Sequence, residues 1–225
     1  LLAILLLRER PVEREAPAAT TGPLSYLRSI AEEKVALRFF AAQFFWWLGF
    51  WMVSTFSALF VVEELQVPEG ESFLVLAVFS VVAALFMLPV GMLGDRFGRK
   101  GVLSVLVGGW AAAQIVIGFS QNLTLALLTV GGSALPFAGG GAVGLAYMLD
   151  LVPRKRTAEF VGFSVISVAV AQIVGPLIGG KLIDVIGYRS IFPAAAAAMI
   201  VGLIILQFVS PRPSQNEASP GTPVT

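Results

Sequence analysis

Two short charged segments, each held between glycines, separate long apolar segments of this chain. The first reads Gly91-Met-Leu-Gly-Asp95-Arg96-Phe-Gly98-Arg99-Lys100, and a fainter copy reads Gly180-Lys-Leu-Ile-Asp184-Val-Ile-Gly187-Tyr-Arg189. Two of the three aspartates of the chain, Asp95 and Asp184, therefore share one setting, with an arginine a few residues later. Carboxylate and guanidinium groups in such a turn can form ion pairs at the water boundary of a membrane. The recurrence predicts an internally repeated membrane protein.

The composition places most of the chain in lipid. Hydrophobic residues make up 57% of it and charged residues 13%, against about 25% charged residues in a soluble domain. The net charge of +1 gives no basic field for binding nucleic acid. The chain has no cysteine and no histidine, so it lacks a thiolate nucleophile, a Ser-His pair and the usual zinc ligands. We therefore expect neither an enzyme nor a protein that needs a cofactor or a metal.

Six apolar segments follow one another from residue 39, each of about the 20 residues that a helix needs to cross a bilayer. They are Phe39–Val62, Phe73–Met92, Gly101–Phe119, Leu123–Leu149, Ala158–Ile183 and Ile191–Val209. They predict an all-α membrane protein with six transmembrane helices. We assign residues 39–209 to this domain, residues 8–38 to a linker and residues 210–225 to a disordered tail. The apolar run Leu1–Leu7 is too short to span and is interpreted as the end of a preceding transmembrane helix.

Cationic residues indicate which helix ends face the cytoplasm. Of the 15 lysines and arginines, only Lys181 and Arg189 fall on one side; the others lie in the linker, after the second and fourth spans, and in the tail. By the positive-inside rule the crowded side is cytoplasmic, with the linker and the C-terminus of this multi-pass protein of the plasma or inner membrane. The Asp95 turn then lies inside and the Asp184 turn outside, each after the second helix of three. This arrangement indicates two inverted three-helix repeats.

These motifs resemble those of the major facilitator superfamily. Its loop signature G-x-x-x-D-R-x-G-R-R/K is met at every fixed position between Gly91 and Lys100. The segment from Asp150 to Arg156 looks like the family's acidic-Pro-basic connection after the fourth helix, and the run Ala171–Gly180 is similar to an antiporter pattern of the fifth helix. The resemblance implies one six-helix half of a twelve-helix bundle in the lipid bilayer. A cut helix and a linker in front favour the C-terminal half, whose partner would be the missing N-terminal half.

The resemblance also implies a conformational latch at the cytoplasmic end, made of ion pairs that form in one transport state only. The residues assigned to it are Gly91, Asp95, Arg96, Gly98, Arg99, Lys100, Asp150, Arg154, Arg156 and Glu159. The glycines would allow a tight turn and close packing. In the alternative interpretation Asp95 only caps the N-terminus of the next helix, where unpaired N–H groups and the helix dipole stabilise a carboxylate.

Polar and small residues inside the spans indicate a solute pathway. A buried amide or hydroxyl needs a partner, so we interpret five residues as lining a substrate cavity: Gln43, Trp47, Ser54, Ser133 and Gln172. An aromatic belt at the headgroups is an equal interpretation for the tryptophans of the first span. The fourth span contains residues that fit either a gating helix or close helix packing. They are Gly131, Gly132, Pro136, Gly139 and Gly140.

The favoured function is a secondary transporter that moves a small solute, sugar-like or otherwise neutral, by alternating access. No acidic or basic residue lies deep in a span, so a coupling ion would have to be handled by the missing half. A drug or metabolite efflux antiporter is the alternative within this class, and a non-transporting membrane scaffold or sensor is the alternative from another class. An intramembrane aspartyl protease is excluded because all three aspartates lie at helix ends.

The predicted topology can be tested with single cysteines, because the chain has none of its own. Glu69→Cys or Ser120→Cys should react with a membrane-impermeant maleimide added to intact cells. Arg156→Cys should react only after the membrane has been opened. Labelling of position 156 from outside would overturn the whole orientation.

Overall fold

The computed structural model describes residues 33–152 and 156–210 of this protein. The chain divides into two units, Leu1–Glu33 and Lys34–Thr225, and every helix given below belongs to the second. The segment predicted to end a preceding helix, most of the predicted linker, Arg154 and the tail from residue 211 lie outside the described residues.

Long helices make up nearly all of the described chain. They are α3 (Lys34–Ser54), α4 (Ser57–Glu63), α5 (Glu69–Phe97), α6 (Arg99–Gly118), α7 (Leu123–Leu151), α8 (Thr157–Ile186) and α9 (Ile191–Gln207), with a short 3-10 helix, η2, at Tyr188–Ser190. With α3 and α4 counted as one span, six spans in the described part of the chain are long and apolar enough to cross a membrane. The predicted all-α fold with six transmembrane helices is confirmed.

Two helix starts differ from the predicted ones by four or five residues. α3 begins at Lys34, so the end of the predicted linker is helical. α5 begins at Glu69 rather than Phe73, and it carries Glu69 and Glu71 in its first turn, where the helix dipole stabilises carboxylates. Hydropathy misplaced these starts because a helix can begin with polar residues outside its apolar span.

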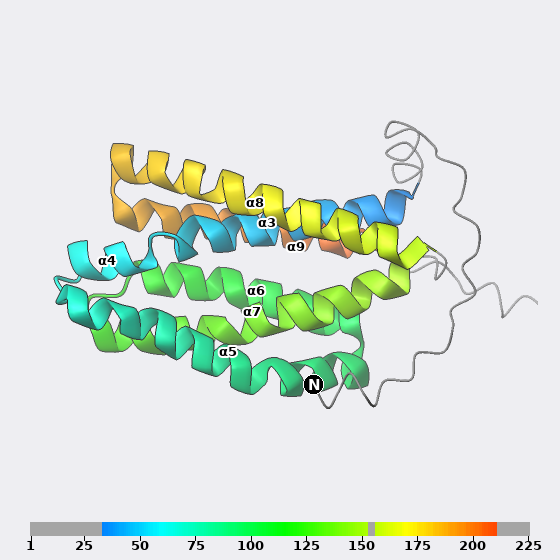
Figure 1. Ribbon diagram of the computed structural model, residues 1–225, viewed down its shortest axis with the longest axis horizontal. Helices are drawn as coiled ribbons and strands as arrows, with labels where there is room; N and C mark the ends of the chain where they lie inside the picture. Colours follow the sequence, from blue (N-terminus) through cyan, green and yellow to red (C-terminus); the bar gives the residue numbers. More distant parts are fainter. Residues whose placement is uncertain (1–32, 153–155, 211–225) are drawn as a thin grey trace, which may run out of the picture. The chain divides into compact units, whose positions relative to one another are not determined.

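The helices form two groups of three that meet where α6 contacts α9. In one group α3 packs on α8 and α9, and in the other α7 packs on α5 and α6 (Figure 1). In chain order, the first three spans begin with α3, α5 and α6, and the last three are α7, α8 and α9. Exchanging α3 with α7, α5 with α8 and α6 with α9 leaves these main contacts unchanged. The packing therefore has the symmetry that two inverted three-helix repeats require.

The two repeated motifs end in the same kind of backbone turn. Gly98 separates α5 from α6 with a φ of 91°, and Gly187 separates α8 from η2 with a φ of 108°. Positive φ suits glycine, which has no Cβ to clash with the backbone. These two glycines therefore let one helix stop and the next one start almost at once.

Each motif also supplies a cation to the C-terminal end of a helix in the other repeat. Lys100 Nζ donates to the backbone oxygen of Gln207, the last residue of α9, at 2.8 Å. At the opposite end of the bundle, Arg189 Nη1 donates to the oxygens of Gly118 and Ser120, where α6 ends, at 2.7 and 3.2 Å. A helix end has carbonyls without partners in the helix, and a cation there also suits the dipole. Lys100 and Arg189 hold the same motif position, so the two caps are reciprocal.

The first span is interrupted, which the sequence analysis did not predict. α3 ends at Ser54 and α4 begins at Ser57. Thr55 Oγ1 donates to the oxygen of Trp51 at 3.0 Å, and Ser57 Oγ donates to the oxygen of Ser54 at 3.0 Å. Such side-chain hydrogen bonds compete with the helical ladder and bend helices. Clustered hydroxyls, with no proline or glycine among them, accompany the break.

Backbones of neighbouring helices come close together at glycines. A Cβ on Gly202 of α9 would lie 2.7 Å from the backbone oxygen of Ala42 in α3. A Cβ on Gly175 of α8 would lie 2.9 Å from the backbone nitrogen of Met52, also in α3. Small residues at helix contacts are the usual means of close approach in membranes. α3 is therefore clamped between α8 and α9 at distances that exclude side chains.

We expect Gly202→Ala to destabilise the bundle, because the backbone of α3 cannot move aside as a flexible side chain can. Overpacking of this kind costs about 1–3 kcal/mol, so the thermal unfolding midpoint of the full-length protein in detergent should fall. Gly132→Ala is the matched control, since a Cβ there meets nothing within 4 Å and alanine favours a helix. Equal midpoints for the two variants would contradict the close contact of α3 with α9.

The topology test also gains a preferred position from the structure. Ser120 is fully buried, whereas Glu69 is exposed. A cysteine at Ser120 would be shielded from the reagent whichever side it faced. Glu69→Cys is therefore the variant that reports on this end of the bundle.

Candidate functional site

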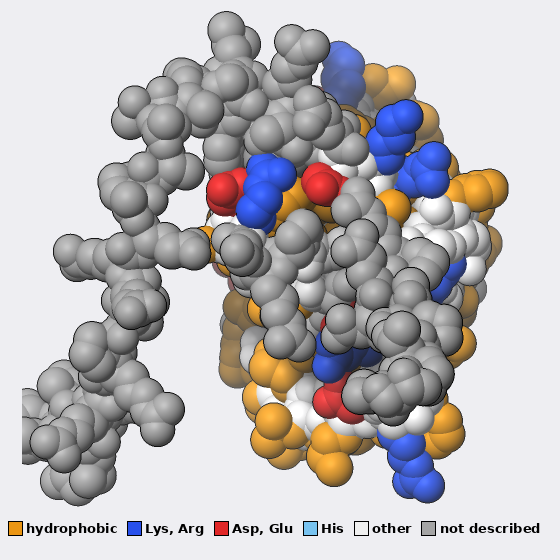
Figure 2. Space-filling model, turned by 90° about the vertical axis from the view of Figure 1, so that its right-hand side faces the viewer, with side chains coloured by type: hydrophobic (Ala, Val, Ile, Leu, Met, Phe, Trp, Pro, Cys, Tyr) orange, Lys and Arg blue, Asp and Glu red, His pale blue; other side chains and the backbone are white. Residues whose placement is uncertain are grey.

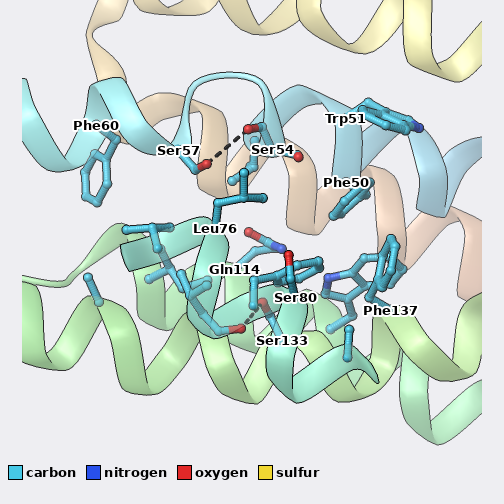
Figure 3. A pocket seen from close by; sticks show the side chains of 18 of the residues that line it. Phe50, Trp51, Ser54, Ser57, Phe60, Leu76, Ser80, Gln114, Ser133 and Phe137 are labelled. Carbon is cyan, nitrogen blue, oxygen red and sulfur yellow. Dashed lines mark hydrogen bonds between the residues drawn. The ribbon is translucent and has the colours of Figure 1, made fainter. Parts of the chain in front are cut away.

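A cavity of about 650 Å³ opens between the two helix groups. Residues from all six spans line it, and Figure 3 shows residues of α3 and α4 facing residues of α5, α6 and α7. Both sides of the break in the first span contribute, through Ser54 and Ser57. The volume lies within the range of about 300–1,000 Å³ that is typical of small-molecule sites.

Aromatic rings form the middle of the cavity wall. Trp47, Phe50, Trp110 and Phe137 come from three helices, and their ring centroids lie 4.9–6.2 Å from one another. Most of these pairs are edge-to-face or tilted, which the ring quadrupoles favour. No Asp, Glu, Lys or Arg is among the described residues that line the cavity. The site can therefore act through shape, aromatic contact and a few neutral polar groups, and not through charge.

The structure brings together only part of the predicted cavity. Three of the predicted residues line it, namely Trp47, Ser54 and Ser133. Gln43 is buried elsewhere, and its Oε1 accepts a hydrogen bond from Ser164 Oγ at 2.9 Å, which links α3 to α8. Gln172 is exposed on α8 and does not line this cavity. Burial of Trp46 and Trp47 inside the bundle argues against a headgroup belt for these two rings.

Other lining residues were not selected from the sequence. They include Phe50, Gln114 and Phe137. Phenylalanines are too frequent in the spans, 17 in the whole chain, for any one of them to stand out. Gln114 had a usable signal, because it is the only amide side chain in the apolar segment from Gly101 to Gly118.

The predicted gating residues lie in one uninterrupted helix, since α7 continues through Pro136. A Cβ on Gly139 would lie 2.8 Å from the Val90 side chain, so this glycine lets α7 approach α5. Gly131 and Gly140 have ordinary contact distances of 3.4 Å, and Gly132 has open space. Close packing thus accounts for Gly139, while bending of α7 during transport stays a prediction.

At the end of the bundle where α5 stops and α6 starts, Arg99 joins two carboxylates. Its Nη2 lies 2.8 Å from Asp95 Oδ1 and its Nη1 lies 2.7 Å from Asp150 Oδ1. Nη1 also donates to the backbone oxygen of Ala146 at 3.1 Å. This cluster, which we call the Arg99 network, ties the end of α5 to the end of α7. Figure 2 shows that end, where acidic and basic side chains gather among apolar ones.

The helix-capping alternative for Asp95 is not supported by this geometry. Asp95 lies in the last turn of α5, and the N-cap residue of α6 is Gly98, without a side-chain cap. The Asp95 carboxylate instead accepts hydrogen bonds from Arg99 Nε and Nη2 at 3.1 and 2.8 Å. The capping interpretation placed the start of the next helix at Gly101, whereas α6 begins at Arg99.

The remaining predicted latch residues have other neighbours in the described part of the chain. Arg156 pairs with Glu159 at 2.9 Å at the start of α8. Arg96 lies over the ring of Phe97 at 5.4 Å, and Lys100 caps α9 as described above. A Cβ on Gly91 would meet nothing within 4 Å. Of the predicted set, the structure thus brings Asp95, Arg99 and Asp150 together in one network.

Another ion pair, which the sequence analysis missed, lies at the opposite end. Arg189 Nε is 3.0 Å from Glu64 Oε2, just after α4. The guanidinium also lies 5.6 Å from the ring of Phe60, which packs edge-on against Phe192 at 4.7 Å. These contacts hold α4 against the ends of α6 and α9. The motif could have revealed Arg189, because it matches Lys100 in the other repeat.

Comparison with known proteins identifies the family. The family model named Major Facilitator Superfamily matches residues 39–224. The chain belongs to this superfamily. Its members are transporters and not enzymes, which agrees with the prediction that this chain is no enzyme.

Curated relatives and a solved structure agree with this assignment. The chain is 34% identical over 173 residues to the multidrug resistance protein MdtG of Proteus mirabilis, covering 71% of this chain and 40% of that protein. It is 31% identical to the class H tetracycline resistance protein of Pasteurella multocida, covering 59% of this chain and 33% of that protein. The crystal structure of the POT family transporter PepTSo superposes with a TM-score of 0.71 at 14% identity, over 81% of this chain and 40% of that one, which shows the fold alone. The chain spans less than half the length of these proteins.

Proposed function

We propose that the full-length protein is a secondary transporter that moves a small uncharged solute by alternating access, with this chain as its C-terminal six-helix half. The observation that carries the proposal is the cavity of about 650 Å³, which residues of all six spans line without a charged group among the described ones. Such a cavity inside a transmembrane bundle has the size of a small-molecule binding site. Membership of the superfamily supports the same function.

The partner proposed for this chain is the missing N-terminal half of the same protein. α5 and α8 are the least buried spans of the bundle, so they have the most surface available for another six-helix unit. Gln172 lies exposed in the middle of α8. An amide at that depth is unfavourable against lipid tails and favours a surface that faces protein or a water-filled pathway.

Export is the direction that the comparisons favour. Two of the relatives are named as a multidrug resistance protein and a tetracycline resistance protein. The aromatic, uncharged cavity wall also suits an apolar molecule better than a sugar, whose hydroxyls need many polar partners. The drug or metabolite efflux alternative is therefore preferred to uptake of a sugar-like solute. A coupling ion would bind in the other half, because no charged residue lines this cavity among those described.

The proposed role of the Arg99 network is to hold one access state, with its end of the bundle facing the cytoplasm by the positive-inside rule. Arg99 is the shared partner of Asp95 and Asp150, so the loss of either carboxylate weakens the tie between α5 and α7. The side chains are 32–65% exposed. Each pair alone is therefore worth about 0–1 kcal/mol, and the network as a whole more.

Transport through the cavity is tested with Ala84→Trp in the full-length protein. Ala84 lines the cavity but is exposed, so tryptophan there fills the cavity without disturbing the buried core. Counterflow of labelled glucose, chloramphenicol and ethidium into proteoliposomes compares a sugar, a neutral aromatic and a cation. We expect chloramphenicol flux well above that of empty liposomes, lost in Ala84→Trp. Ala112→Trp, on an exposed position of α6 that does not line the cavity, should keep the flux. Equal inhibition by both variants would contradict transport through this cavity, and no flux of any solute would favour the scaffold or sensor alternative.

The latch is tested by Asp95→Asn and Asp150→Asn. Each variant replaces one carboxylate partner of Arg99 by a neutral amide of the same shape, so the protein should still be expressed. A loss of about 1–2 kcal/mol shifts the ratio of access states roughly 5- to 30-fold, and transport should fall steeply while cysteine accessibility shifts between the two ends. Asp184→Asn is the matched control, because this exposed aspartate of the second motif forms no ion pair among the described residues. Normal transport by Asp95→Asn and Asp150→Asn would rule out the latch.

A further inference from the structure

Gln114 is a buried amide in the wall of the aromatic cavity. It lies on α6 between Trp110 and Ile117, which line the same cavity one turn to either side. Only 3% of its surface is exposed. In Figure 3 its amide lies among the labelled side chains of Leu76, Ser80 and Ser133, in the space between the two helix groups.

The amide oxygen of Gln114 is buried and has no hydrogen-bond partner among the described residues. Four buried indole N–H groups, those of Trp46, Trp47, Trp51 and Trp110, also lack a partner among the described residues, whereas the buried Gln43 and Ser133 have one. Gln43 Oε1 accepts from Ser164 at 2.9 Å, and Ser133 Oγ donates to the oxygen of Val130 at 2.7 Å. A buried acceptor that loses water without gaining a donor costs free energy. No described residue donates to Gln114 Oε1, although the wall contains indole N–H groups and serine hydroxyls, so this oxygen is left open to a donor from a bound molecule.

The rest of the wall restricts what can carry that donor. The rings of Trp47, Phe50, Trp110 and Phe137 offer flat apolar contact around the cavity. A molecule with a fixed charge would find no counter-charge among the described lining residues. A sugar would place several hydroxyls against aromatic carbon, although one acceptor can satisfy only one or two of them.

We propose that Gln114 Oε1 is a specificity-determining acceptor, which selects uncharged aromatic molecules that carry an O–H or N–H group. The ring system of the ligand would lie against the aromatic wall, and its donor would bind the amide oxygen. This inference rests on the proposed transport function and names the substrate class of its cavity.

Equilibrium binding of two labelled probes to the detergent-solubilised full-length protein tests the proposal. 2-Naphthol carries an O–H donor, and 2-methoxynaphthalene has nearly the same shape without a donor. We expect the wild-type protein to bind 2-naphthol about tenfold more tightly, which corresponds to about 1.4 kcal/mol. Gln114→Met keeps the length of the side chain and removes the amide, so the affinity ratio should fall to about one, through weaker binding of 2-naphthol alone.

Two further variants keep the test decisive. Gln121→Met removes an exposed amide that lies outside the cavity, so it should keep the wild-type ratio. Gln114→Glu places a carboxylate at the same point and should bind a protonated amine, 2-naphthylmethylammonium, about tenfold more tightly than the wild type does. This variant decides the matter if Gln114→Met does not fold.

The proposal and the transport function fail in different ways. An unchanged ratio in Gln114→Met, or a wild-type protein that does not distinguish the probes, would overturn the role of Gln114 even if proteoliposomes show flux. Discrimination that depends on Gln114 in a protein without flux would preserve the binding site and reject transport.

Discussion

Hydrocarbon offers no hydrogen-bond partner to a peptide group, so the chain itself must supply the partners of its backbone groups. Helices satisfy their own backbone along their length, but the carbonyls at each C-terminal end need another donor. Lys100 reaches the end of α9, and Arg189 reaches the end of α6. Each repeat thus closes a helix of the other repeat, at opposite ends of the α6–α9 contact that joins the two groups. The paired motifs therefore stabilise the ends of the helices, whatever part they also play in transport.

The same constraint distinguishes the ends of the bundle from its middle. Charged groups lie at the two ends, in the Arg99 network and in the pair of Arg189 with Glu64. The cavity between them has aromatic and neutral polar walls among the described residues. Phe60 belongs to both regions, since it lines the cavity and lies beneath the Arg189 guanidinium. The segment α4 is therefore in contact with the cavity on one side and with a charged cluster on the other.

In the described part of the bundle, the buried side-chain atoms without a hydrogen-bond partner are Gln114 Oε1 and the indole nitrogens of four tryptophans. Gln43 and Ser164 satisfy each other between α3 and α8, and their bond is best understood as part of the packing. Gln114 has an equally polar side chain but no partner for its oxygen within the described part. Gln43 thus has a structural amide, whereas the amide oxygen of Gln114 is available to a ligand. The difference arises from the helices around them and not from residue type.

The sequence by itself determined the class, the spans and the symmetry of this protein. Hydropathy revealed the spans because each must match the thickness of the bilayer, and the glycine motifs revealed the turns because Gly98 and Gly187 both adopt positive φ. Of the latch, the pairing of the motif with Asp150 could be predicted from the resemblance, because both positions belong to the family pattern. Only the tertiary structure decided that Gln43 is satisfied, that Gln172 faces outward and that Gln114 lines the cavity. A side chain's partner depends on which helix packs across from it, and hydropathy does not encode that choice.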